Sequence, residues 1–340
     1  MTTTENHHIV LASRPTDGFR ATDLRLETEA VVPLGAGQVR VEVDTLSVDA
    51  FIRTTLNADS YHQSVAVGGK VMALGVGRVL ESADDSFAVG DTVFGPLGAQ
   101  TISQVPAPFL QKVDVSTVPA RSYLGALGLT TGLTAYFGIV DVGAVGPGDT
   151  VVVSGAAGAV GSFAGQIARL RGAAKVIGIA GGAAKCTFLV DELGFDAAID
   201  YKNEVVADRL CDVAPNGIDV FFDNVGGGIL DDVLFQISER ARVVICGAIS
   251  QYEHMESVSG PTNYLKLAER HARMEGFAVT HFTEHFPRAQ ADLMGWLTGG
   301  DLVVHEHVEH GIESFPMALQ KLLTGGHTGK LLVQVNANAS

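Results

Sequence analysis

Cysteine is scarce in this chain of 340 residues, which contains only Cys186, Cys211 and Cys246. An odd and sparse set of cysteines argues against a disulfide framework. Such usage is typical of reduced thiols in a cytosolic compartment. We therefore expect no disulfides.

Positive charge is also in short supply. The chain has 23 basic and 38 acidic residues, a net charge of −15, which would repel phosphate backbones and anionic lipid surfaces. This balance argues against nucleic acid as a partner. Any phosphate that the protein binds would be held locally, by backbone N–H groups and one or two placed cations, and this favours a nucleotide cofactor.

Long apolar runs are absent as well. No stretch approaches the length needed to span a membrane, and the segment Met1–His8 lacks the basic start and apolar run of a signal peptide. We expect no membrane association and a cytoplasmic location. The 46% hydrophobic and 18% charged residues fit a globular enzyme. The length fits two domains of roughly 100 to 200 residues each.

The pattern of residues changes along the chain. Three short β-rich runs interrupted by Gly and Pro predict an irregular β domain over residues 1–123. These runs are Val39–Thr45, Val71–Val79 and Asp91–Phe94. From Leu124 apolar strands alternate with helical stretches, which predicts an α/β domain over 124–302. The segment 303–340 returns to β-like character and is expected to complete the first domain.

The second domain is predicted to hold a doubly wound parallel sheet. Its expected strands are Thr150–Ser154, Lys175–Ala180, Ala197–Asp200, Ile218–Asp223, Arg242–Gly247 and Gly276–Val279. Between the first two, Val160–Arg171 has the spacing of an amphipathic helix and ends at Gly172. The predicted fold class is therefore α/β.

A glycine loop follows the first of these strands. Ser154-Gly155-Ala156-Ala157-Gly158-Ala159-Val160-Gly161 lies between a strand and a helix and has the pattern Ala-x-Gly-x-x-Gly. Small residues let the backbone approach a pyrophosphate and direct the positive end of a helix at it. A tight turn with close helix packing is the alternative, but the order strand, loop, helix favours dinucleotide binding.

The end of the second strand indicates which dinucleotide. NAD-preferring sites have an acid about 20 residues after the loop, which binds the ribose 2′-hydroxyl. Here the strand ends Ile179-Ala180-Gly181-Gly182, without an acid, and Lys185 follows. A lysine can attract a 2′-phosphate as a point charge. We expect NADPH over NADH; an ordinary solvated lysine is the alternative for Lys185.

Four segments carry a resemblance to a known family: Leu46–Asp49, Gly155–Ser162, Phe222–Gly227 and Cys246–Tyr252. Through them nearly the whole chain resembles the medium-chain dehydrogenase/reductase superfamily. Within it the chain is most similar to the zinc-independent branch of prostaglandin reductases, leukotriene dehydrogenases and curcumin reductases. The resemblance implies a GroES-like catalytic domain, a Rossmann domain, NADPH as cofactor and a homodimer.

The resemblance also implies which residues contact the cofactor. These are Ala157, Gly158, Ala159, Val160, Lys185, Tyr201, Asn224, Cys246, Gly247, Ala248, Ile249, Ser250, Tyr252, Phe277, Ala278, Val279 and His327. Two positions depart from the branch. Gly182 stands where a serine is common, and His327 stands where the tail Gly-x-Asn-x-Gly-Lys has asparagine. Both departures predict a less strict preference for NADPH.

No metal is expected. Zinc-dependent members of the superfamily need a catalytic Cys/His set and a four-cysteine lobe, which three scattered cysteines cannot supply. His305, Glu306, His307 and His310 are the remaining candidates. Alternation along a strand would put His305 and His307 on one face and Glu306 on the other, so we predict a surface strand.

Reduction of a conjugated double bond suits a site without metal. Hydride goes to the β-carbon, and donors must stabilise the charge that develops on the carbonyl oxygen. Tyr252, after the fifth strand, is the first candidate donor, and Tyr61, on a loop of the first domain, is the second; either could instead be a structural phenol. The sequence predicts an NADPH-dependent reductase of enones or enals. A quinone reductase and a non-catalytic NADPH-binding scaffold are the alternatives.

Overall fold

The computed structural model describes residues 5–58, 63–253 and 255–335. The chain separates into two compact units, one formed by Met1–Leu124 with Glu306–Ser340 and the other by Gly125–His305. Among the residues described, no helix combines the length and the apolar character needed to cross a membrane. The assignment of catalysis to the first unit and of NADPH binding to the second stays a prediction.

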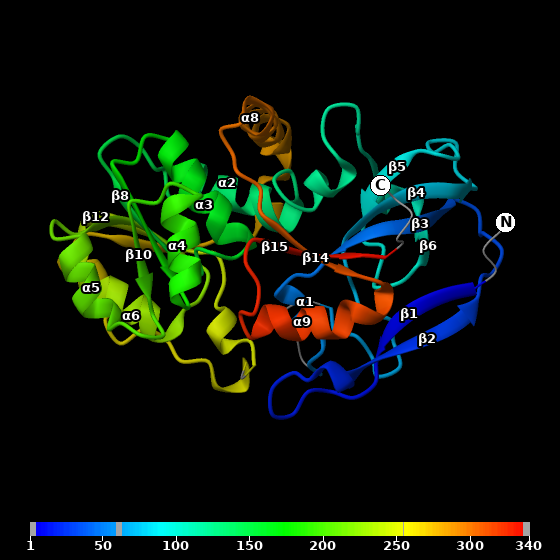
Figure 1. The fold of residues 1–340 in the computed structure, drawn as a ribbon, viewed down its shortest axis with the longest axis horizontal. Coiled ribbons are helices and arrows are strands. Elements are labelled where there is room, and N and C mark those ends of the chain that lie inside the picture. The colour runs from blue at the N-terminus through cyan, green and yellow to red at the C-terminus, as the bar shows by residue number, and fades with distance from the viewer. Residues whose placement is uncertain (1–4, 59–62, 254, 336–340) are drawn as a thin grey trace. The chain divides into compact units, whose positions relative to one another are not determined.

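The first unit is β-rich, as expected (Figure 1). A sheet runs in the order β14-β15-β3-β4-β5-β7, with β6 also pairing with β3, and β1 pairs with β2 separately. Its elements are β1 (Glu5–Leu11), β2 (Leu24–Ala30), β3 (Gln38–Ser47), α1 (Phe51–Thr55), β4 (Gly75–Ser82), β5 (Thr92–Gly95), β6 (Ile102–Pro106), β7 (Gln111–Lys112), β14 (Glu306–His310), α9 (Phe315–Leu323) and β15 (Lys330–Gln334). Along β3, Val39, Val41 and Val43 alternate with partly exposed residues and are fully buried, the period-two pattern of a sheet with one packed face.

The predicted β runs of this unit overlap real strands with shifted ends. Val39–Thr45 lies inside β3, and Asp91–Phe94 overlaps β5. The run Val71–Val79 was placed too early, because Val71 donates its N–H to the carbonyl of Ile9 in β1 at 2.9 Å and β4 begins only at Gly75.

The second unit contains a parallel sheet in the order β10-β9-β8-β11-β12-β13. Every neighbouring pair is parallel. Its strands are β8 (Thr150–Ser154), β9 (Lys175–Ala180), β10 (Ala197–Asp200), β11 (Ile218–Asp223), β12 (Ile237–Ile245) and β13 (Arg273–Gly276). The strand order reverses between β8 and β11. This topological switch point is where open α/β sheets bind ligands, at the carboxyl ends of the strands.

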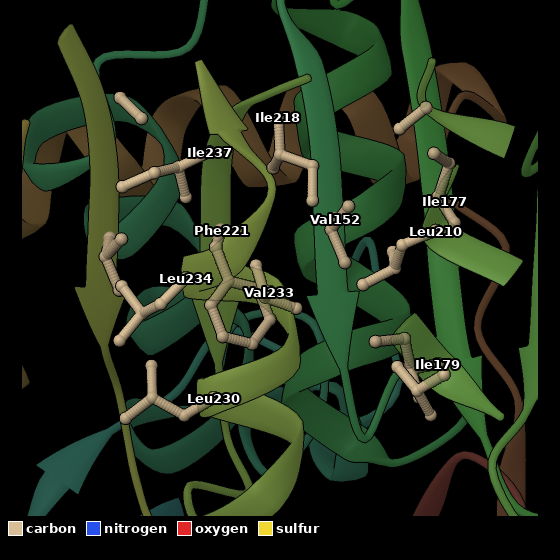
Figure 2. Close-up of a cluster of buried hydrophobic side chains, with 14 of the residues drawn as sticks. Val152, Ile177, Ile179, Leu210, Ile218, Phe221, Leu230, Val233, Leu234 and Ile237 are labelled. Carbon is tan, nitrogen blue, oxygen red and sulfur yellow. The ribbon is translucent and has the colours of Figure 1, made fainter. Parts of the chain in front are cut away.

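Helices α3 to α6 pack on the two faces of this sheet, and the unit has seven α-helices among the residues described. They are α2 (Thr134–Phe137), α3 (Ala159–Leu170), α4 (Ala183–Asp191), α5 (Val206–Val213), α6 (Gly227–Phe235), α7 (Leu265–Glu269) and α8 (Phe286–Gly299). Figure 2 shows one face, where Val152, Ile179 and Phe221 pack against Leu210 of α5 and Leu234 of α6. Each such side chain contributes about 1.5–3 kcal/mol when fully buried. On the other face, a Cβ on Gly178 would lie 2.7 Å from Leu189 of α4.

The first four predicted strands of this unit, β8 to β11, are confirmed residue for residue, but the last two are corrected. β12 ends at Ile245, not at Gly247. β13 covers Arg273–Gly276, whereas the sequence predicted Gly276–Val279. The reason is that β13 is an exposed edge strand with polar residues, while the apolar segment Phe277–Val279 follows it.

Candidate active site

The glycine loop leaves the end of β8 at the switch point. Gly155 has φ +58°, a left-handed conformation that glycine adopts without strain. A Cβ on Gly161 would lie 2.4 Å from the Gly155 carbonyl oxygen, so α3 packs directly on the loop. A Cβ on Gly158, the residue before α3, would meet only that same oxygen, at 3.3 Å. The first turn of a twelve-residue helix thus presents unpaired N–H groups beside an open backbone, an arrangement that fits a pyrophosphate.

Hydrogen bonds tie the ends of β8 and β11 together beside this loop. Ser154 Oγ donates to Asp223 Oδ1 at 2.7 Å, and the Asn224 N–H donates to Ser154 Oγ at 2.8 Å. The side-chain amide of Asn224 also donates to the Ser154 carbonyl at 2.7 Å. Asp223 is fully buried, and this burial raises its pKa, although the hydrogen bonds from Ser154, Gly226 and Val225 oppose the shift. A buried hydrogen-bond network therefore fixes the ends of β8 and β11 relative to each other.

The segment Cys246–Tyr252 lies across the end of β11. The N–H groups of Cys246 and Gly247 donate to the Asp223 carbonyl at 2.9 and 3.1 Å. The Ile249 N–H donates to the Asn224 carbonyl at 3.1 Å. The residues predicted to contact the cofactor from β8, β11 and β12 thus come together at the switch point.

Tyr252 turns its hydroxyl back towards its own loop. The Ala248 N–H donates to Tyr252 Oη at 3.4 Å, and a Cβ on Gly247 would lie 3.0 Å from the same oxygen. Desolvation raises the pKa of Tyr252 above its ordinary value of about 10, so the phenol keeps its proton at neutral pH. An accepted N–H and a retained proton leave this hydroxyl able to donate.

The neighbouring Cys246 does not have a nucleophile's properties. Although the residue keeps some exposed surface, desolvation of its sulfur, with a smaller contribution from Asp223, raises the pKa of the thiol to about 12. A thiol with such a pKa is almost wholly protonated at neutral pH, and only the thiolate attacks.

A second corner lies at the ends of β9 and β10. Lys185, in the first turn of α4, is partly buried, and desolvation, followed by the charge of Lys202, lowers its pKa. Sequence reasoning missed Lys202. The feature that could have identified it is its position directly after Tyr201, just beyond the carboxyl end of β10, where ligands of such sheets bind.

Phe277–Val279 follow the end of β13, where Gly276 pairs with Ile245 of β12, so they leave the sheet at the same edge as Cys246. The ring of Phe277 lies near Gly138, on which a Cβ would be 2.9 Å away, and its centroid is 6.1 Å from that of Phe282. Ala278 and Val279 follow it at the start of a 3₁₀ helix. His327 belongs to the other unit, in the segment before β15. Tyr61 lies outside the described residues.

Three residues of the histidine cluster, Glu306, His307 and His310, lie in a strand as predicted, and His305 falls just outside it. His305 lies just before β14, and its ring packs against Phe188 with the centroids 4.8 Å apart. His307 lies within the strand and has its Nε2 3.1 Å from Glu309 Oε1. Within the part of the chain that the structure describes, no three His, Cys, Asp or Glu residues are grouped to hold a metal ion.

A β-rich unit and a doubly wound sheet with a glycine loop at its switch point define a dinucleotide-dependent oxidoreductase fold. Residues 7–113 match the family model described as the N-terminal domain of oxidoreductase, and residues 159–294 match that of zinc-binding dehydrogenase. The chain belongs to the medium-chain dehydrogenase/reductase superfamily, in its zinc-independent branch.

Relatives of known name match almost the entire chain. The Bacillus subtilis protein YfmJ is 41% identical over 338 residues, covering 98% of this chain and 99% of the relative. The 2-alkenal reductase (NADP(+)-dependent) of Nicotiana tabacum is 36% identical, covering 97% and 98%. The crystal structure of CurA from Vibrio vulnificus in complex with NADPH has a TM-score of 0.90 and 35% identity, covering 97% of this chain and 99% of CurA.

Proposed function

We propose that the protein reduces the carbon–carbon double bond of α,β-unsaturated ketones and aldehydes with NADPH. The observation that carries this proposal is the partly buried hydroxyl of Tyr252 on a loop bonded to the end of β11, beside the glycine loop. The tobacco relative, named a 2-alkenal reductase, supports the class of reaction. The NADPH complex of CurA supports the cofactor.

The residues of the second unit fit NADPH. The N–H groups around Ala157–Val160 would hold the pyrophosphate at the start of α3, and Lys185 would hold the 2′-phosphate. Asn224 and Cys246–Tyr252 would surround the nicotinamide end. When bound, NADPH supplies the hydride. Two features support this placement: these residues follow the carboxyl ends of strands of one sheet, and the backbone at Gly158 is open.

Tyr252 would stabilise the substrate as charge moves onto its carbonyl oxygen. Because the Ala248 N–H already donates to Tyr252 Oη, the phenolic proton is left to point away from the loop. A donor aimed at the developing enolate oxygen binds the transition state more tightly than the ground state. Burial raises the pKa of this phenol, which further favours its protonated form.

A substrate panel tests the proposal. NADPH oxidation should be fastest with enals and enones and slow with quinones and simple ketones. A preference for quinones would make the protein a quinone reductase. NADPH binding without turnover of any substrate would make it a binding scaffold.

We also propose that two copies pair through β13. This strand lies at the edge of the sheet, its four residues are all exposed, and Arg273 Nε is 3.4 Å from Glu275 Oε2. An antiparallel pairing centred on Met274 would set Arg273 of one copy opposite Glu275 of the other.

Sedimentation tests this pairing. The mass should be twice the 35.6 kDa of one chain, and Met274→Glu should lower it towards 35.6 kDa, because two like charges would meet at the centre. A variant that sediments as the unmodified protein does would contradict this edge, and Val190→Glu, an exposed position on α4, is the control.

A further inference from the structure

The corner at the ends of β9 and β10 brings two chain segments together. The strands are parallel neighbours with Ala180 opposite Asp200, and the Tyr201 N–H donates to the Ala180 carbonyl at 3.1 Å. The residues after Ala180 and those after Asp200 therefore leave the sheet side by side.

Gly181 lets the side chains of the second segment fold over the first. A Cβ at this position would lie 2.9 Å from Lys202 Cε and 2.9 Å from Tyr201 Cε1, too close for any residue but glycine without a shift. Although Lys202 is exposed, its side chain thus lies over Gly181 at the end of β9, two residues before α4 begins.

Asp200 holds this geometry in place. One of its oxygens accepts the N–H groups of Gly182 at 2.7 Å and Lys202 at 3.1 Å, and the other accepts the Asn203 amide at 2.7 Å. The hydrogen bond from Asn203, then that from Gly182, lowers the pKa of Asp200, so its charge persists at neutral pH. A single lysine would have to attract a phosphate against this charge.

The two lysines influence each other. The charge of Lys202 contributes, after desolvation, to lowering the pKa of Lys185. Like charges at one corner repel, and an anion bound between them would relieve the repulsion. A phosphomonoester carries about −1.5 to −2 charges at pH 7, which one lysine cannot neutralise.

We propose that Lys202 is a second cation of the 2′-phosphate subsite and that, together with Lys185, it determines the preference for NADPH over NADH. This inference rests on the proposed cofactor. It assigns to Lys202 a role in specificity. The added positive charge would compensate for Gly182, which has no hydroxyl to donate to the phosphate.

Calorimetric titration of the whole protein with 2′,5′-ADP and 5′-AMP tests the assignment without turnover. Lys202→Ala should weaken 2′,5′-ADP binding about three- to tenfold and leave 5′-AMP unchanged, and Lys202→Arg should restore most of the affinity. Lys185→Ala, at a less exposed position, should weaken it roughly ten- to a hundredfold. Lys175→Ala, at the opposite end of β9, is the matched control and should change neither.

Phosphorus NMR of bound NADP⁺ gives an independent measurement. The second pKa of a free phosphomonoester is about 6, and two nearby cations should keep the bound phosphate dianionic to lower pH. Lys202→Ala should therefore move this titration to higher pH.

Two outcomes distinguish a failure of the role of Lys202 from a failure of the cofactor proposal. If Lys202→Ala changes neither the 2′,5′-ADP affinity nor the phosphate titration while Lys185→Ala weakens binding, Lys202 has no such role and the cofactor proposal stands. If the unmodified protein binds 2′,5′-ADP no better than 5′-AMP, the proposed NADPH preference itself is wrong.

Discussion

The two ends of the candidate site are built in opposite ways. At the switch point a fully buried Asp223 joins three strand ends through hydrogen bonds of 2.7–3.1 Å and supports the loop that carries Tyr252. At the β9–β10 corner the buried carboxylate of Asp200 positions the backbone, but the two cations, Lys185 and Lys202, are partly exposed and exposed. A rigid, desolvated region suits transition-state stabilisation, because its donors need no reorganisation, whereas exposed charges suit ligand selection.

The largest effect should come from breaking the rigid end. Asp223→Ala leaves Ser154 and the N–H groups of Val225 and Gly226 without their acceptor, which should lower the free energy of unfolding by roughly 3 kcal/mol or more. Urea unfolding measures the change. Asp219→Ala, at the other end of β11, removes one hydrogen bond to Thr150 and should cost about 1 kcal/mol. Equal decreases would mean that the Asp223 network contributes no more to the free energy of unfolding than the single hydrogen bond of Asp219.

Removing the Tyr252 hydroxyl should have a smaller effect, confined to the chemical step. Tyr252→Phe should lower kcat about tenfold and change KM little, because the hydrogen bond strengthens in the transition state and a cofactor hydroxyl can share the substrate oxygen. Steady-state kinetics with an enone measures both constants. Tyr264→Phe, at an exposed position of the same unit, should leave both unchanged. A raised KM at constant kcat would make Tyr252 a binding residue only.

Chelation should have the smallest effect. Neither region requires a metal, since the proposed donors are a phenol, backbone N–H groups and lysines, and the described residues offer no group of three ligands. Activity should persist after exhaustive dialysis against a chelator. Stoichiometric zinc that leaves the protein together with activity would reverse this interpretation of the histidines.

Sequence reasoning succeeded where a segment is buried on both faces. β8 is a run of fully buried valines, and its ends were predicted residue for residue, as were those of the neighbouring β11. β13 was misplaced because its residues Arg273–Gly276 are all exposed and form no apolar run, unlike those of the other edge strand, β10, whose last two residues are buried. The strand was predicted at the more apolar Phe277–Val279 instead.

Lys202 was missed for a different reason. Its position depends on the pairing of β9 with β10 and on the missing side chain of Gly181, which are contacts between residues about 20 apart in the chain. No local motif marks such a residue. The Tyr252 loop was found because its segment resembles the family, but its hydrogen bond to Ala248 could be seen only in the structure.

The position of the transferred hydride tests the central claim most directly. With NADPH deuterated at the transferred position of C4 and an enone substrate, mass spectrometry and NMR should find the label on the β-carbon of a saturated ketone whose carbonyl is intact. Label on the former carbonyl carbon, in an allylic alcohol, would contradict double-bond reduction and make the protein a carbonyl reductase.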